Sequence, residues 1–217
     1  MSLEEELREL RDAAKTDEKL QAAYEDLINR LGRAETAERA LKIGDRMPSF
    51  VLPNAEGRLV ISDELLARGP LVVSFFRGNW CPYCRKALKA LEAALPSIES
   101  ARGRLVALTP ETGHHLADTK REQRLSYEVL SDLDGAVGLQ FGVLYRAPAA
   151  YRAVLAGFGI DLAERHGNEA WFIPIPASFV VDRSGTIRYA FVDVDFTHRA
   201  EPEEIVAVLK RIVDRSP

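Results

Sequence analysis

The sequence is short of cysteine, methionine and tryptophan, with two of each among its 217 residues. Two cysteines are too few for the disulfide framework of a small secreted protein, and a hydrophobic content of 47% supplies a core without such cross-links. No uninterrupted apolar run is long enough to span a bilayer, and the acidic start MSLEEELREL lacks the apolar region of a signal peptide. We therefore expect a cytoplasmic protein that does not associate with membranes.

The chain also lacks a strong excess of either charge. Its 29 Lys and Arg residues stand against 33 Asp and Glu residues, for a formal net charge of −4. This balance gives no electrostatic reason to expect nucleic acid or an anionic membrane as a partner. Internal repeats and low-complexity tracts are absent, so the length fits one large domain or a domain with an extension.

The two cysteines that are present lie together, in Cys81-Pro82-Tyr83-Cys84. Before them, Leu71 to Phe76 is a short apolar run rich in β-branched and aromatic residues, which is typical of a strand buried on both faces. After them, Arg85 to Leu95 carries apolar residues at helical spacing. The sequence therefore predicts that the cysteines lie at a junction between a strand and a helix.

Proline is favoured at the first helical position, so Pro82 predicts where this helix begins. Cys81 is then expected near the N-cap and Cys84 in the first turn. The positive end of the helix dipole stabilises a thiolate there and lowers its pKa. The spacing also allows the two cysteines to form a small disulfide, so the pattern indicates redox chemistry.

Two other interpretations of the cysteines are inert core thiols and a zinc site. Zinc needs two further ligands, and the histidines show no paired spacing apart from one adjacent pair. The histidines are His114, His115, His166 and His198. We therefore expect neither a metal nor an organic cofactor.

Two units are predicted along the chain, a helical N-terminal extension at 1–41 and a larger domain at 42–217. Narrow apolar stripes predict two helices in the extension, divided near Thr16-Asp17, where an N-cap restarts the pattern. Such helices pack either on their own domain or on a partner subunit. We see no chemistry in them.

The larger unit alternates strands and helices, which is typical of parallel α/β layers. An insertion at 143–172 fits this alternation less well, and we expect a lid or a subunit contact there. A hairpin turning at Ser184-Gly185 and a final helix then complete the chain. The other predicted elements are a hairpin around Asn54–Gly57, strands at 104–108 and 127–130, and helices at 115–125, 131–141 and 202–213.

Four segments of the larger unit resemble the alkyl hydroperoxide reductase and thiol-specific antioxidant family, the peroxiredoxin group of thioredoxin-fold proteins. The resemblance covers roughly residues 42 to 214 and is specific in order and spacing. The segments are GDRMPSF at 44–50, FFRGNWCPYC at 75–84, YEVLSD at 127–132 and PASFVVDRSGTI at 176–187.

This resemblance implies a thioredoxin-like α/β fold, with a mixed central sheet and helices on both faces. It places Cys84 at the position of the peroxidatic cysteine and Cys81 where peroxiredoxins carry a Thr or Ser. It also makes Pro176 a candidate cis-proline facing the thiols. The arginine that peroxiredoxins use to polarise the peroxide aligns with Pro176 and is absent, so Arg77 and Arg85 are the candidates to replace its charge.

The leading hypothesis is a thiol peroxidase in which Cys84 attacks a hydroperoxide, Cys81 resolves the sulfenic acid, and a thioredoxin-like thiol donor reduces the disulfide. The alternative is a thioredoxin-like disulfide oxidoreductase in which Cys81 is the nucleophile. A third hypothesis is a redox sensor or scaffold with the N-terminal helices as its partner surface. The resemblance also allows a homodimer.

Overall fold

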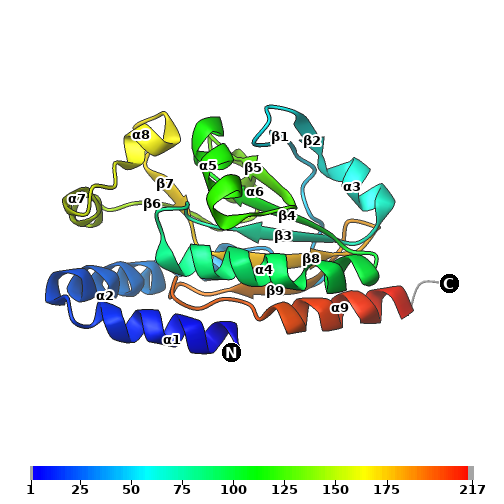
Figure 1. The fold of residues 1–217 in the computed structure, drawn as a ribbon, viewed down its shortest axis with the longest axis horizontal. Helices are drawn as coiled ribbons and strands as arrows, with labels where there is room; N and C mark the ends of the chain where they lie inside the picture. The colour runs from blue at the N-terminus through cyan, green and yellow to red at the C-terminus, as the bar shows by residue number, and fades with distance from the viewer. Residues whose placement is uncertain (1, 215–217) are drawn as a thin grey trace.

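A five-stranded mixed sheet forms the centre of the protein, which is described here for residues 2–214 of a computed structural model (Figure 1). The outer ends of the two predicted units, Met1 and 215–217, lie outside the described residues. The strands run in the order β5-β4-β3-β8-β9, with β3, β4 and β5 parallel and β8 and β9 antiparallel to their neighbours. Their bounds are β3 (Leu71–Phe75), β4 (Arg104–Thr109), β5 (Glu128–Ser131), β8 (Ala177–Val181) and β9 (Ile187–Val192).

Both faces of the sheet are covered, which confirms the predicted α/β fold class. Along β3, Val72 belongs to the apolar cluster on one face, while Val73 and Phe75 belong to the cluster on the other. This alternation follows from the two-residue period of a strand. One face carries α4 (Pro82–Ser100), α5 (Gly113–Gln123) and α9 (Pro202–Asp214), and the other carries α3 (Ser62–Arg68) and α6 (Ala136–Gln140).

The N-terminal extension forms two helices, α1 (Leu3–Ala14) and α2 (Glu18–Arg33), as predicted. The Asp17 carboxylate accepts hydrogen bonds from the first turn of α2, so the chain restarts its helix at the expected place. Leu7 and Leu27 are fully buried and belong to the same apolar cluster as α4. The extension therefore shares the main core of the domain, with α1 lying against α4 (Figure 1).

The insertion begins and ends in a two-stranded antiparallel ribbon that the sequence did not indicate. Tyr145 pairs with Ile173 at its centre. Strands of three residues are too short for their periodicity to stand out from a loop. The ribbon is β6 (Leu144–Arg146) with β7 (Phe172–Pro174), and between them lie α7 (Ala149–Gly157) and α8 (Leu162–His166).

The remaining elements are short. The predicted first hairpin is confirmed, with Leu52 paired to Val60. Among residues 2–214, no helix combines the length and apolar character needed to cross a bilayer. The bounds are β1 (Val51–Pro53), β2 (Leu59–Ile61) and the short 3₁₀ helix η1 (Ala37–Arg39).

The prediction of a cis-proline at Pro176 is wrong, because all peptide bonds within residues 2–214 are trans. Pro176 joins β7 to β8 without a turn. On one side of it, the Ile175 N–H donates to the Val143 carbonyl at 2.7 Å; on the other, Ala177 pairs with Phe75. The chain stays extended through the proline, so nothing in this path requires a cis bond.

Candidate active site

The two cysteines lie where β3 ends and α4 begins. Cys81 is the N-cap of α4 and Pro82 opens the helix, as the sequence predicted. Both are free thiols, and the exposed fractions of Cys81 and Cys84 are only 1% and 0%. A reagent or substrate must therefore enter the protein to reach either sulfur.

Gly78 allows the loop before the motif to pass close to its neighbours. Its φ of +141° is rarely adopted by residues with a side chain. A Cβ there would lie 2.4 Å from Trp80 Nε1 and 2.8 Å from an oxygen of Glu111. The loop therefore holds its position only with glycine at this place.

Two donors point at the sulfur of Cys84. The backbone N–H of Arg77 lies 3.4 Å from Cys84 Sγ, and Nη2 of Arg199 lies 3.3 Å from the same atom. Arg199 comes from the segment between β9 and α9, where its Nη1 donates to the carbonyl oxygens of Phe196 and His198. A positive charge and an amide donor are therefore in place for a negative charge on Cys84.

The guanidinium of Arg77 is buried among aromatic rings. Its Cζ lies 4.0 Å from the ring centroid of Phe196 and 4.7 Å from that of Trp80, and it donates a hydrogen bond to the hydroxyl of Tyr151. The aromatic faces offset part of the cost of burying its charge. Arg77, predicted as a stand-in for the missing arginine, is thus part of the site.

Several buried polar atoms of this site have no hydrogen-bond partner among the described residues. They are Arg77 Nε, Trp80 Nε1 and the Tyr145 hydroxyl. Buried polar groups are nearly always paired in folded proteins. These three therefore mark positions where a small polar molecule would gain hydrogen bonds.

The two thiols share one negative charge. Burial raises the pKa of Cys81, but the hydrogen bond from Cys84 and the charges of Arg77 and Arg199 outweigh it and lower the pKa to about 5. Burial, together with the hydrogen bond to Cys81 and its negative charge, raises the pKa of Cys84 well above its ordinary range. One thiolate is thus present at neutral pH, and the hydrogen bond lets the proton pass between the sulfurs.

The sequence analysis missed Arg199, and Arg85 lies elsewhere. Arg85 is exposed, and its guanidinium donates to the Asn79 carbonyl oxygen at 3.2 Å, so this contact is with the loop and not with a sulfur atom. No motif surrounds Arg199 in the sequence, and it reaches Cys84 from 115 residues away. Only the path of the chain after β9 brings it to the site.

A buried carboxyl group holds the loop in front of the cysteines. Glu111 is fully buried, accepts the Asn79 backbone N–H at 3.0 Å and pairs with Arg165 at 2.9 Å. Burial raises the pKa of Glu111 to about 7, against the opposing effects of Asn79 and Arg165. The insertion, which contains Arg165, therefore supports the cysteine loop.

Aromatic side chains from distant segments cover the thiols. Tyr24 of α2 lies 4.8 Å, centroid to centroid, from Phe196, and 6.3 Å and 6.5 Å from Tyr83 and Tyr151. Tyr151 belongs to α7 of the insertion. Both the N-terminal extension and the insertion thus contribute to closing the site.

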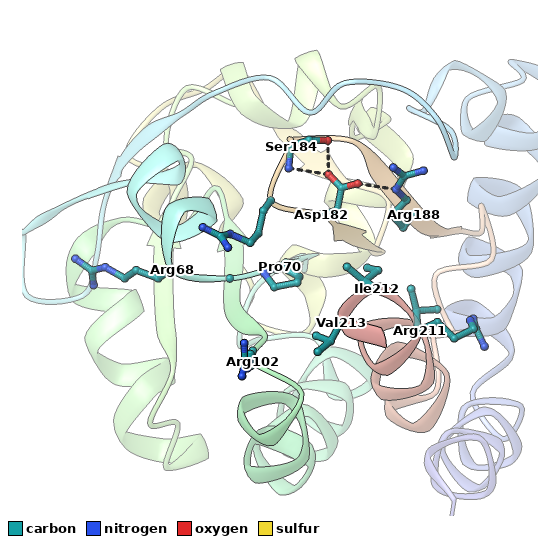
Figure 2. Close-up of a pocket in the computed structure, with 12 residues that line it drawn as sticks. Arg68, Pro70, Arg102, Asp182, Ser184, Arg188, Arg211, Ile212 and Val213 are labelled. Atoms are coloured by element: carbon teal, nitrogen blue, oxygen red, sulfur yellow. Dashed lines mark hydrogen bonds and ion pairs between the residues drawn. The ribbon is translucent and has the colours of Figure 1, made fainter. Parts of the chain in front are cut away.

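A separate pocket of about 600 Å³ lies at the opposite end of β3, beside Pro70 (Figure 2). Asp182 at its rim is already bonded to Ser184 and Arg188. Its lining includes Arg68, Arg102, Arg183 and Arg211 but neither cysteine. Since the thiols follow the other end of the strand, this pocket is not part of the redox site.

Solved structures of similar fold include peroxiredoxins. Peroxidoxin BcpB from Mycobacterium tuberculosis has a TM-score of 0.63 and 23% identity, covering 81% of this chain and 99% of that one. Peroxiredoxin Q from Xanthomonas campestris has a TM-score of 0.57 and 17% identity, covering 76% of this chain and 91% of that one. At these identities the likeness supports the thioredoxin-like fold.

Sequence relatives include two kinds of thiol protein. A Mycobacterium tuberculosis protein provisionally named a peroxiredoxin is 29% identical over 103 residues, 48% of this chain and 67% of its own length. The thiol-disulfide oxidoreductase ResA of Bacillus thuringiensis is 23% identical over 153 residues, 70% of each chain. The AhpC/TSA family profile matches residues 43–190, which include both cysteines. The protein therefore belongs to the AhpC/TSA family.

Proposed function

We propose that this protein is a thiol-dependent peroxidase in which Cys84 reduces a hydroperoxide and Cys81 resolves the product. Membership of the AhpC/TSA family supports the reaction class. The observation that supports the assignment of Cys84 is the pair of donors on its sulfur, from Arg77 and Arg199. Arg199 supplies the charge of the peroxiredoxin arginine that is absent at Pro176, and the backbone amide of Arg77 adds a second donor.

In the first step, Cys84 passes its proton to the Cys81 thiolate, attacks one oxygen of the hydroperoxide as a thiolate, and the O–O bond breaks. Cys84 becomes a sulfenic acid, and the other oxygen leaves as an alcohol or water after taking the proton from Cys81, which is left as the thiolate. Cys81 then attacks the sulfenic sulfur, a disulfide forms, and water leaves. Arg199 stabilises the negative charge that develops on the leaving oxygen.

The buried thiols favour small hydroperoxides, because a bulky one must displace the aromatic cover. Arg77 Nε and Trp80 Nε1 have no partner within residues 2–214 and can donate to peroxide oxygens. Hydrogen peroxide and short alkyl hydroperoxides are therefore the substrates we propose.

A thiol donor must reduce the disulfide, and a thioredoxin-like dithiol protein is the donor we propose. We further propose a cytoplasmic setting, since a reducing compartment keeps both cysteines as thiols between turnovers. A homodimer remains a prediction from the family resemblance. Sedimentation of the full chain tests it.

The alternative function, protein disulfide exchange, is favoured by the low pKa of Cys81 at the N-cap of α4. ResA, a relative of this chain, is named for that activity. The burial of Cys81 opposes it, because a partner disulfide must reach the attacking sulfur. The peroxidase proposal needs only a small substrate to enter.

The test is hydrogen peroxide consumption coupled to a thioredoxin system, with wild type, Cys81→Ser and Cys84→Ser. We expect Cys84→Ser to abolish consumption, and Cys81→Ser to stop after one turnover with a sulfenic acid that a dimedone probe traps at Cys84. If peroxide reacts no faster than with free cysteine, and wild type instead reduces a protein disulfide through Cys81, the alternative function is correct.

A further inference from the structure

Two histidines and a glutamate lie together beside the redox site, on α5 and α8. His114 and His115 are in the first turn of α5, and Glu164 is in α8 of the insertion. One ligand atom from each of the three lies within 4.8 Å of the others. The two helices are neighbours in Figure 1, although His115 and Glu164 are 49 positions apart in the sequence.

We propose that His114, His115 and Glu164 bind a divalent transition metal ion of the zinc type. Imidazole nitrogen and carboxylate oxygen are ordinary ligands of zinc, and a site with three protein ligands leaves one position to water. The proposal does not depend on the peroxidase assignment, because neither cysteine is a ligand.

The distances agree with tetrahedral coordination. Ligand atoms about 2.1 Å from a tetrahedral zinc lie about 3.4 Å from one another. Nε2 of His115 is 3.1 Å from both oxygens of Glu164, and Nε2 of His114 is 3.6 Å from Oε1. Both distances to the carboxylate lie close to the expected edge, and the edge between the two histidines is no longer than 4.8 Å.

A second contact orients one of the histidines. Nδ1 of His114 lies 3.2 Å from the Thr112 hydroxyl, which leaves Nε2 free to face the metal. Metal-bound histidines usually have such a partner on the other ring nitrogen. The Thr112 N–H also donates to the Arg165 carbonyl at 2.9 Å, so the backbones that carry the ligands are joined.

The surroundings leave the three ligands accessible to a cation. The side chains of His114 and Glu164 are 64% and 58% exposed, so an ion can enter from solvent. Arg165, the nearest positive charge in sequence to Glu164, is paired with the buried Glu111.

Such an ion would join the insertion to α5. The ion would also help to hold the loop in front of the cysteines. The residue after Glu164 is Arg165, which bonds Glu111, and Glu111 accepts the Asn79 backbone N–H. The structure thus assigns the site a bracing role for the insertion, at a place where no sulfur takes part.

The test is zinc binding by the full chain carrying Cys81→Ser and Cys84→Ser, which removes the thiols as competing ligands. Competition with a chromophoric chelator should show one equivalent of zinc. Either His115→Ala or Glu164→Gln should weaken its affinity at least tenfold. Asp118→Asn is the matched control, since it removes a nearby negative charge without removing a ligand, and it should leave the affinity within about twofold.

Two more readouts keep the test decisive if a variant folds poorly. Glu164→His replaces one zinc ligand by another and should retain binding. Zinc should also slow hydrogen exchange of the α8 amides, residues 162–166, in the parent but not in Glu164→Gln. Absence of binding at about 100 μM zinc, or equal affinity in the parent, His115→Ala and Glu164→Gln, would overturn the proposal.

Discussion

The guanidinium of Arg199 lies 3.3 Å from the sulfur of Cys84, although 115 residues separate the two in the sequence. By the family resemblance, Pro176 stands where peroxiredoxins carry an arginine, and it contributes no charge. The chain thus brings a positive charge to the thiol from the segment before α9. The first prediction concerns this contact.

Arg199→Gln should raise the pKa of the thiol pair by about one unit or more, because an opposite charge close to a thiolate is lost. It should also slow peroxide reduction about a hundredfold, since the leaving oxygen loses its stabilising donor. Stopped-flow measurement of the peroxide reaction over a range of pH separates the two effects.

Arg85→Gln is the matched control, as it removes the same charge from an arginine that contacts only a loop carbonyl among its described bonds. Its rate should stay within about twofold of wild type. Equal losses in the two variants would show that overall charge matters rather than the contact with Cys84.

The pH dependence of thiol reactivity follows from the lowered pKa of Cys81, about 5 against an ordinary value of 9.0. As the pH falls through 5, the thiolate takes up a proton and reactivity should drop with a midpoint near 5. Above that pH reactivity should stay nearly constant. Ultraviolet absorbance of the thiolate, recorded during a pH titration, measures the midpoint.

The same titration in urea provides the comparison, because an unfolded chain should show a midpoint near the ordinary cysteine pKa of 9.0. A folded midpoint that matched the unfolded one would mean that the arginines do not act on the thiols.

Removing the aromatic cover should expose the thiols to bulky reagents. Tyr24→Ala deletes the ring that contacts Phe196, and labelling by a large maleimide should accelerate about tenfold or more as local opening becomes easier. The rate of reaction with hydrogen peroxide, which is small, should increase much less. Mass spectrometry of the labelled chain over time gives the rates.

Tyr24→Phe keeps the ring and removes only the hydroxyl, so it should label like wild type. If Tyr24→Ala also labelled like wild type, the route to the sulfurs would lie elsewhere than under α2.

A substitution at Gly142 tests how tightly the segment that follows α2 packs against the domain. Its φ is +70°, and a Cβ would lie 2.1 Å from the Arg39 carbonyl oxygen. Gly142→Ala should therefore lower the free energy of unfolding by about 3 kcal/mol or more, through strain and a backbone clash. Urea denaturation followed by circular dichroism measures the loss.

Gly57→Ala separates the two contributions, because Gly57 has a φ of +77° but no atom of the described residues within 4 Å of its Cβ position. It should cost only about 1 kcal/mol, the strain of the backbone. Similar losses of unfolding free energy at the two positions would show that the Arg39 carbonyl moves away from the added Cβ without destabilising the protein.

Much of the site was predictable where its parts are neighbours in sequence. The run before the motif, the N-cap position of Cys81 and the start of α4 at Pro82 follow from local periodicity and helix-start chemistry. Arg77 was predicted because it lies next to the motif. The cis bond at Pro176 was carried over from the family, and it is wrong because every peptide bond within residues 2–214 is trans.

The proposed zinc site on α5 and α8 shows what sequence-local reasoning cannot find. The sequence shows the adjacent His114 and His115 but cannot show that Glu164 lies 3.1 Å from one of them. The β6–β7 ribbon, which closes the insertion, was likewise too short to be seen in the sequence. The position of α8 beside α5 exists only once the insertion is folded.

The sequence by itself determined the strand, the Cys81–Cys84 motif and the helix, because each depends on interactions among residues a few positions apart. Only the tertiary structure decided that both thiols are buried, that Tyr24 and Tyr151 cover them, and that Arg199 supplies the charge. These features depend on which distant segments meet. Burial and electrostatic contacts act through space, so they arise only when the whole chain has packed.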